Sequence, residues 1–163
     1  MISFAVKYRI MNYIETEIQG VWILEPRIFE DARGYFMETY RAEDFDKNIG
    51  TTVFVQDNES RSSYGVLRGL HYQKGEWSQA KLVRVIEGKV LDVAVDIRKG
   101  SPTFGQWVSV ELTAENHRQF FIPRGFAHGF LTLTEDVEFR YKCDNVYNKA
   151  SEGGMRYDAP EVA

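Results

Sequence analysis

The chain has 163 residues and a mass of 18.9 kDa, the size of a single domain with its own hydrophobic core. Hydrophobic residues make up 44% of the chain and aromatic residues 14%, a composition that excludes a disordered protein and favours β-structure. The net charge of -4 argues against non-specific binding of nucleic acid, the single Cys143 excludes an internal disulfide, and no apolar run approaches the roughly 20 residues that cross a membrane.

Short runs of β-branched and aromatic residues recur along the chain and are separated by turn residues. In chain order the predicted strands are residues 21–25, 35–40, 52–57, 66–73, 81–86, 89–98, 105–112, 118–122, 126–134 and 137–143. Residues 42–49 are expected to form a helix, because acidic residues occupy the first turn, Lys47 lies near the end and Gly50 follows. Many strands around one short helix predict an all-β sandwich or barrel.

The strongest local pattern lies in residues 81–98. Two predicted strands flank a Glu-Gly pair at 87 and 88, which predicts a tight hairpin. In the second strand, Leu91, Val93, Val95 and Ile97 alternate with Val90, Asp92, Ala94 and Asp96. A two-residue loop places Lys81 one diagonal step from Asp92 on the same face of the sheet. Two interpretations stay open: a solvated outer face, or a polar barrel interior that lines a ligand cavity.

The candidates for chemistry include three histidines, His71, His117 and His128. Residues 123–128 follow a predicted strand and read Pro-x-Gly-x-x-His, which is similar to the second motif of the cupin jelly rolls. The first cupin motif has His-x-His before a carboxylate, whereas the matching place here reads His71-Tyr72-Gln73. A metal site of two histidines and a carboxylate needs three ligands on one face, so no metal is expected. Taken alone, a histidine in a strand is more often structural.

Ordered sequence blocks run through residues 21–152. They read Leu24-Glu25-Pro26, Asp31-x-Arg33-Gly34-x-Phe36, Phe54-Val55-Gln56-Asp57-Asn58, Val66-Leu67-Arg68-Gly69-Leu70-His71-Tyr72-Gln73, Lys81-Leu82-Val83-Arg84, Asp92-Val93-Ala94-Val95-Asp96-Ile97-Arg98, Ser101-Pro102-Thr103-Phe104-Gly105, Ile122-Pro123-x-Gly125-Phe126-Ala127-His128-Gly129-Phe130 and Tyr141-Lys142. Together they resemble the dTDP-4-dehydrorhamnose 3,5-epimerases, a family of metal-free cupins. The resemblance implies a cupin-type double-stranded β-helix or jelly roll with one short helix, a dTDP-sugar substrate, no cofactor and a homodimer.

The resemblance further implies epimerisation at C3 and C5 of dTDP-4-dehydro-6-deoxy-D-glucose, in dTDP-rhamnose biosynthesis. The C4 ketone makes the hydrogens on both neighbouring carbons acidic, so inversion needs a base, a stabiliser for the enolate and an acid on the opposite face. His71 matches the family's base, Lys81 the residue beside the ketone oxygen, and Tyr141 the acid. Asp92 is expected to hold Lys81 in place. Without the resemblance, Tyr141 would be taken for a core aromatic residue.

The remaining matches concern substrate binding and comprise Arg33, Glu38, Gln56, Asn58, Arg68, Lys81, His128, Tyr147 and Glu152. Arginines suit a diphosphate through forked, charge-assisted hydrogen bonds, and Tyr147 is expected to pack on a thymine or sugar ring. Arg68 and His71 would face opposite sides of a regular strand, but Gly69 between them predicts a bulge that brings both inside. The resemblance implies exchange of N-terminal strands between subunits, with Arg33 and Glu38 reaching the neighbour.

The chain departs from the family at both ends. Relatives continue to a Ser-x-Lys-Asp block, whose Asp pairs with the base histidine and whose Lys helps bind substrate, whereas this chain stops at Ala163. A weakened base is therefore expected. Met11 is the expected start of a family-length chain, no signal peptide is recognised before it, and the cytoplasm is the expected location.

Three interpretations of function stay open for this single domain. The first is the 3,5-epimerase. The second is a catalytically weak or dead cupin that binds a nucleotide sugar. The third is a one-centre epimerase or keto-isomerase that acts on a related dTDP-sugar, because both chemistries place a base beside the same ketone.

Overall fold

The computed structural model describes residues 9–160, and most of the predicted N-terminal extension, residues 1–8, lies outside them. In chain order the elements are β1 (Met11–Glu15), β2 (Trp22–Pro26), β3 (Phe29–Asp31), β4 (Gly34–Phe36), α1 (Ala42–Asn48), β5 (Gln56–Ser62), β6 (Leu67–Gln73), β7 (Lys81–Glu87), β8 (Lys89–Asp96), β9 (Trp107–Thr113), β10 (Gln119–Ile122), β11 (Phe126–Thr132), β12 (Val137–Cys143) and β13 (Glu152–Gly154). Short 3-10 turns lie at Gly75–Trp77 and Lys149–Ser151.

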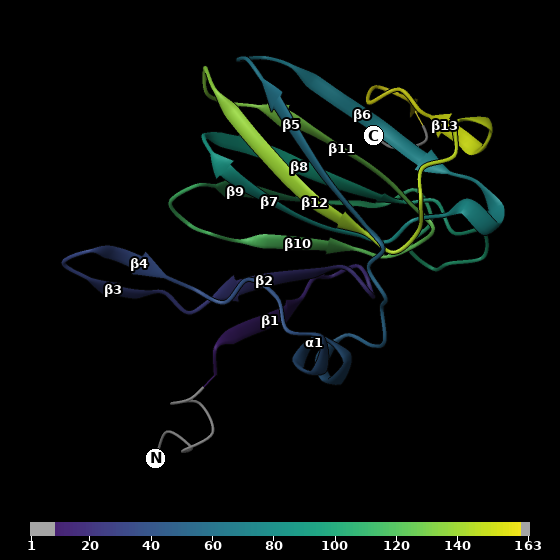
Figure 1. Cartoon of the computed structure of the whole chain (residues 1–163). Coiled ribbons are helices and arrows are strands. Elements are labelled where there is room, and N and C mark those ends of the chain that lie inside the picture. The colour runs from purple at the N-terminus through teal and green to yellow at the C-terminus, as the bar shows by residue number, and fades with distance from the viewer. Residues whose placement is uncertain (1–8, 161–163) are drawn as a thin grey trace.

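Two antiparallel sheets pack on each other and form the body of the described part (Figure 1). The six-stranded sheet has the order β1-β2-β10-β7-β12-β5, and the five-stranded sheet has the order β13-β6-β11-β8-β9. The main core lies between them and includes Val83, Phe120 and Phe139 from the first sheet and Val90 and Leu112 from the second. The predicted all-β sandwich is confirmed.

The predicted helix is confirmed over Ala42–Asn48, with Ile49 at its C-cap. Its one buried residue, Phe45, packs on the outside of the six-stranded sheet, where it contacts Phe121 at a ring-centroid distance of 5.1 Å. Leu24 and Leu82 belong to the same cluster. The helix therefore covers part of the sheet face that points away from the main core.

Several predicted strand limits are wrong, chiefly at the sheet edges. The strand predicted at 52–57 is β5, a polar edge strand that runs from Gln56 to Ser62 and pairs with β12. The strand predicted at 35–40 ends at Phe36, as one half of the β3–β4 ribbon. Three short strands, β1, β3 and β13, had no predicted counterpart. Each is defined by its partner and not by an apolar pattern of its own.

The predicted hairpin at residues 87 and 88 is wrong. β7 pairs with β10 and β12 in one sheet, whereas β8 pairs with β11 and β9 in the other, so the chain crosses between sheets at Gly88. The buried face of β8 is nevertheless the one that carries Val90, Asp92 and Ala94, each fully enclosed. Of the two interpretations left open, the polar barrel interior is therefore correct.

The predicted bulge at Gly69 is confirmed. His71 lies opposite His128, whereas Arg68 lies opposite Phe130, so β6 contains one residue more than β11 over this stretch. Gly69 has a φ of +123°, and a Cβ added there would lie 2.5 Å from the Cα of Gly129. The bulge turns Arg68 and His71 towards the same interior cavity.

We expect Gly69→Ala to lower the free energy of unfolding by about 3 kcal/mol, because the side chain meets both a forbidden φ and the backbone of β11. Gly75→Ala is the matched control: Gly75 also has a positive φ, +58°, but open space around it, so the cost there should be about 1 kcal/mol. Urea denaturation of both variants measures the difference. Equal losses would show that the close approach to β11 has no energetic effect.

Candidate active site

Polar side chains interrupt the apolar rows that line the space between the sheets. Along β7, Lys81 precedes Val83 on the inner face, and along β12 Tyr141 follows Phe139. On the opposite sheet, Asp92 and His128 take inner positions of β8 and β11. Residues from four strands therefore meet at one end of the core, where apolar packing gives way to cavities.

Two cavities share three residues, His71, Lys81 and Tyr141. The larger, of about 280 Å³, is called the mouth cavity and is lined by Gln56, Asn58, His71, Tyr72, Gln73, Gln79, Lys81, Tyr141, Tyr147 and Glu152. The smaller, of about 170 Å³, is called the inner cavity and is lined by Ser60, Arg68, His71, Lys81, His128, Phe130, Phe139 and Tyr141. The three shared residues therefore stand where the two cavities meet.

The electrostatic surroundings suit these three residues to proton transfer. Burial, followed by the positive charge of Lys81, lowers the pKa of His71 below its usual 6.5, so the imidazole is a free base at neutral pH. Burial raises the pKa of the Tyr141 phenol, which therefore keeps its proton, and burial lowers the pKa of the half-buried Lys81. The Lys81 Nζ lies 5.7 Å from the centre of the Tyr141 ring.

Asp92 contacts a different partner from the one expected. Its Oδ1 lies 2.8 Å from Nε2 of His128, and no ion pair joins it to Lys81, whose charge acts on it only from a longer distance. Burial raises the pKa of Asp92, an effect that His128 and Lys81 oppose. Asp92 therefore orients a histidine directly, and the lysine only through its charge.

The mouth cavity is shaped by a loop that two glutamines hold. The Gln73 Nε2 donates to the carbonyls of Trp77 and Val146, at 2.6 and 3.2 Å, and its Oε1 accepts from the Asn148 N–H at 2.7 Å. The Gln56 Oε1 accepts from the Tyr147 N–H at 3.0 Å. The loop places Tyr147 over the cavity, so Gln73 is a scaffold residue that sequence reasoning missed.

The carboxylate of Glu152 stands beside both the loop and the base. Its Oε2 accepts a hydrogen bond of 2.9 Å from the Tyr147 hydroxyl, and its Oε1 lies 3.9 Å from Nδ1 of His71. Among residues 9–160, Glu152 is the only residue whose carboxylate lies within 4.0 Å of a His71 ring nitrogen. At that separation it attracts a protonated imidazole but makes no hydrogen bond that would orient the ring.

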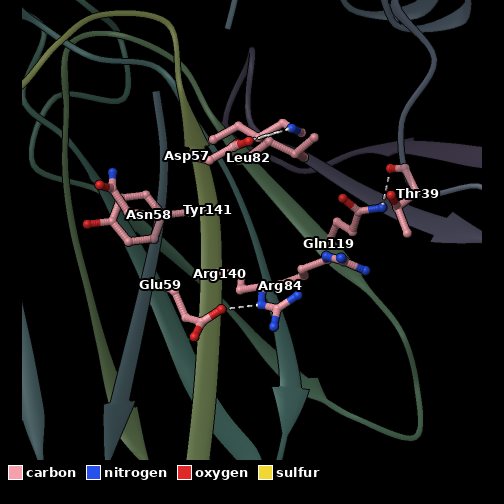
Figure 2. A pocket seen from close by; sticks show the side chains of 10 residues that line it. Thr39, Asp57, Asn58, Glu59, Leu82, Arg84, Gln119, Arg140 and Tyr141 are labelled. Atoms are coloured by element: carbon pink, nitrogen blue, oxygen red, sulfur yellow. Dashed lines mark hydrogen bonds and ion pairs between the residues drawn. The ribbon is translucent and has the colours of Figure 1, made fainter. Parts of the chain in front are cut away.

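A third pocket, of about 430 Å³, lies on the reverse face of the six-stranded sheet (Figure 2). Its charged residues mostly pair with each other: Arg140 with Glu59 at 2.6 Å, and Lys142 with Asp57 at 3.0 Å. Figure 2 shows the Tyr141 side chain turned away from these groups. Alternation along β12 places the charged groups of Arg140 and Lys142 on this outer side, whereas Asn58 and Tyr141 line both the outer pocket and the mouth cavity.

The family described as dTDP-4-dehydrorhamnose 3,5-epimerase matches residues 15–163 of the chain. The chain belongs to this family. The 3,5-epimerase of Shigella flexneri is 57% identical over 153 residues, which cover 93% of this chain and 84% of the relative. The crystal structure of the Legionella pneumophila 3,5-epimerase with dTDP-4-keto-L-rhamnose superimposes with a TM-score of 0.90 at 54% identity, and covers 93% of this chain and 81% of that one.

A more distant epimerase also shares the fold. The 3'-monoepimerase of Streptomyces bikiniensis, solved with dTDP-quinovose, matches at 37% identity with a TM-score of 0.85, over 90% of this chain and 75% of that one. These neighbours confirm the predicted cupin-type fold. Because one family architecture serves both two-centre and one-centre chemistry, fold alone does not separate them.

Most residues that the epimerase family resemblance singled out lie together in this chain. Gln56, Asn58, Arg68, His71, Lys81, His128, Tyr141, Tyr147 and Glu152 line one or both cavities, and Asp92 bonds to His128. Arg68 is fixed by a 2.9 Å hydrogen bond from its Nε to the Ser62 hydroxyl. In the described part of this epimerase, no group of three His, Cys, Asp or Glu side chains could hold a metal ion.

Two predicted binding residues, Arg33 and Glu38, do not reach the cavities of their own chain. Arg33 lies at the β3–β4 turn with 89% of its side chain exposed and pairs with Asp31 at 2.6 Å, while Glu38 pairs with Arg41 at 2.6 Å. Figure 1 shows the ribbon projecting from the body on the side away from β13.

Within residues 9–160 of this epimerase-family chain, no helix is long and apolar enough to span a membrane.

Proposed function

We propose that the chain converts dTDP-4-dehydro-6-deoxy-D-glucose to dTDP-4-dehydro-L-rhamnose by inverting C3 and C5, as a step of dTDP-rhamnose biosynthesis. The observation that carries the proposal is the meeting of His71, Lys81 and Tyr141 at the junction of two cavities. These are an imidazole, an ammonium and a phenol, the three groups that inversion beside a ketone requires. The named activity of the 51–58% identical relatives supports the same reaction.

In the proposed mechanism the neutral His71 removes the proton from the carbon beside the ketone. The electron pair moves onto the ketone oxygen, where the Lys81 ammonium stabilises the enolate. Tyr141 then delivers its proton to the opposite face of the carbon. No cofactor is needed for these steps, because the ketone itself makes the hydrogens acidic.

The rest of the site is assigned to substrate binding. Arg68 in the inner cavity is the proposed partner of an anionic group, through charge-assisted hydrogen bonds. Tyr147 over the mouth cavity is placed to pack on a thymine or sugar ring. We assign hydrogen bonds with the dTDP-sugar to Gln56, Asn58 and Glu152.

We place the reaction in the cytoplasm. The free thiol of Cys143 agrees with this location.

Exchange with solvent tests the proposed function directly. The full chain is incubated with dTDP-4-dehydro-6-deoxy-D-glucose in deuterated water, and NMR locates the label. Deuterium at both C3 and C5 is the expected result. Label at one carbon alone would assign the chain to one-centre epimerases such as the S. bikiniensis neighbour, and no label above background would leave a nucleotide-sugar-binding protein.

We expect Tyr141→Phe to separate proton removal from inversion. The base and the enolate stabiliser remain, so deuterium exchange should continue, whereas net epimerisation should fall by about 10²-fold or more because the opposite-face acid is lost. The phenyl ring keeps its packing beside Phe139, at a ring-centroid distance of 5.9 Å, so stability should change little. Parallel loss of exchange and inversion would refute the assignment of Tyr141 as the acid alone.

We further expect a homodimer in solution, in which the β3–β4 ribbon reaches the neighbouring subunit. The ribbon exposes Phe29, Tyr35 and Phe36, and its strands pair only with each other. Exposed aromatic side chains on a projecting ribbon are typical of a surface that a partner covers. Light scattering at micromolar concentration should give twice the monomer mass. A monomer mass would leave Arg33 and Glu38 outside any site.

A further inference from the structure

The two oxygens of the Asp92 carboxylate have different surroundings. Asp92 lies on the inner face of β8 with no exposed surface, and its Oδ1 is bonded to His128. Its Oδ2 is the one buried side-chain polar atom in residues 9–160 that has no hydrogen-bond partner. No acceptor is present for a proton on Oδ2, so the proton of this pair lies between Oδ1 and Nε2, and we assign it to Nε2 with Oδ1 as the acceptor.

His128 is held firmly by its surroundings. It lies opposite Ala94 in the β11–β8 register, and Asp92 is two residues along β8 on the same face, so the two side chains meet diagonally. The ring stacks on Phe139, with centroids 6.4 Å apart and an interplanar angle of 23°, and the residue is only 7% exposed. Both the position and the orientation of the imidazole are therefore determined.

The second ring nitrogen of His128 opens to the inner cavity. Nδ1 makes no hydrogen bond with the described residues and is not among their enclosed, unpartnered atoms, and His128 lines the inner cavity. Two of its neighbours there, Arg68 and Lys81, can only donate hydrogen bonds. When the Asp92 carboxylate accepts a hydrogen bond from Nε2–H of His128, Nδ1 carries no proton. Nδ1 is then an acceptor that faces the donors Arg68 and Lys81.

We propose that Asp92 is a positioning residue that fixes His128 in the Nε2–H tautomer, and that Nδ1 then accepts a hydrogen bond from a ring hydroxyl of the bound sugar. The identity of the sugar rests on the proposed function, whereas the tautomer does not. His128 thereby becomes a specificity-determining residue. It favours a hexose that carries a hydroxyl at the facing carbon over the corresponding deoxy sugar.

The tautomer is measured by ¹⁵N NMR of the full chain, with the His128 signals assigned by their loss in His128→Gln. We expect the proton on Nε2 and none on Nδ1. In Asp92→Asn the tautomer should reverse, because the amide can donate to Nε2 and the proton then moves to Nδ1. A doubly protonated ring, or a proton on Nδ1 in the unchanged chain, would overturn the proposal.

Asp96→Asn is the matched control for this measurement. Asp96 lies on the same strand and face as Asp92 and is equally buried, but it is bonded to Arg98, Ser101 and Thr103 instead of a histidine. The control should leave the His128 tautomer unchanged. A reversal in Asp96→Asn as well would show a general distortion of β8, which contradicts a specific role for Asp92.

The specificity is measured with two analogues of the dTDP-4-keto sugar, one without the C2 hydroxyl and one without the C3 hydroxyl. Deuterium exchange beside the ketone is the readout. In the unchanged chain, kcat/KM should be about 10- to 100-fold lower for one analogue than for the dTDP-4-keto sugar, which corresponds to one hydrogen bond. In Asp92→Asn the two sugars should have similar kcat/KM values. Unchanged discrimination in the variant would refute the role of the tautomer. Absence of exchange with every sugar would refute the proposed function instead, while the NMR result would still decide the tautomer.

Discussion

Replacing His71 with alanine should lower the rate of deuterium exchange by about 10²- to 10⁴-fold, the usual contribution of a general base. His71 is the one imidazole shared by both cavities, and its pKa is lowered by burial and by the charge of Lys81, so it is neutral and able to accept a proton. Exchange should be lost at C3 and C5 together, because the proposed mechanism uses the same base at both carbons. NMR of the product in deuterated water measures both positions.

His117→Asn is the control for this loss. His117 lies outside both cavities, packs against Tyr35 with ring centroids 5.0 Å apart, and has a φ of +53°, which asparagine tolerates. The control variant should exchange at the rate of the unchanged chain. If His71→Ala kept full exchange at either carbon, a different group would be the base at that carbon, and the assignment would be wrong.

The alternation of residues along β8 correctly identified its two faces but not its neighbours. Val90, Asp92 and Ala94 share a face in both a hairpin and a crossover, so the pattern was satisfied by either arrangement. The pairing of β8 with β9 and β11 depends on contacts far apart in sequence, which local periodicity does not contain. The polar strand β5 was misplaced for a related reason, since its position follows from its ladder with β12.

The composition of the candidate site was predictable chiefly from the resemblance, because single residues allowed several interpretations. Tyr141 continues the row of Phe139 and reads as core, and only its place beside Lys81 distinguishes it. Gln73 was noted for the histidine that it replaces, but its hydrogen bonds to Trp77, Val146 and Asn148 were not predictable from that position. The hydrogen bond between Asp92 and His128 depends on the register of β8 with β11. The sequence pattern instead predicted a hairpin at residues 87 and 88, so it could not identify this partner.

Replacing Lys81 with methionine should lower kcat for proton removal by about 10²- to 10³-fold, as the loss of one oxyanion donor does. Methionine keeps a long apolar side chain beside Tyr141 and removes only the charge. Lys142→Met is the control, because Lys142 lies on the next strand but pairs with Asp57 in the outer pocket. A small effect of Lys81→Met, or an equal effect of both variants, would contradict the role of Lys81 at the ketone oxygen.

The pH dependence of kcat/KM should identify Lys81 independently of the size of that loss. The active ammonium is present below the Lys81 pKa, which burial lowers from 10.5, so activity should fall as pH rises through that lowered value. The active imidazole is present above the His71 pKa, which lies below 6.5, so activity should also fall as pH drops through it.

In Lys81→Met the alkaline limb should move upward, towards the raised pKa of Tyr141. The acid limb should move upward too, because the charge of Lys81 is one cause of the low His71 pKa. An alkaline limb that stays in place would show that Lys81 is not the group that titrates there, and an acid limb that stays in place would show that the charge of Lys81 does not act on His71.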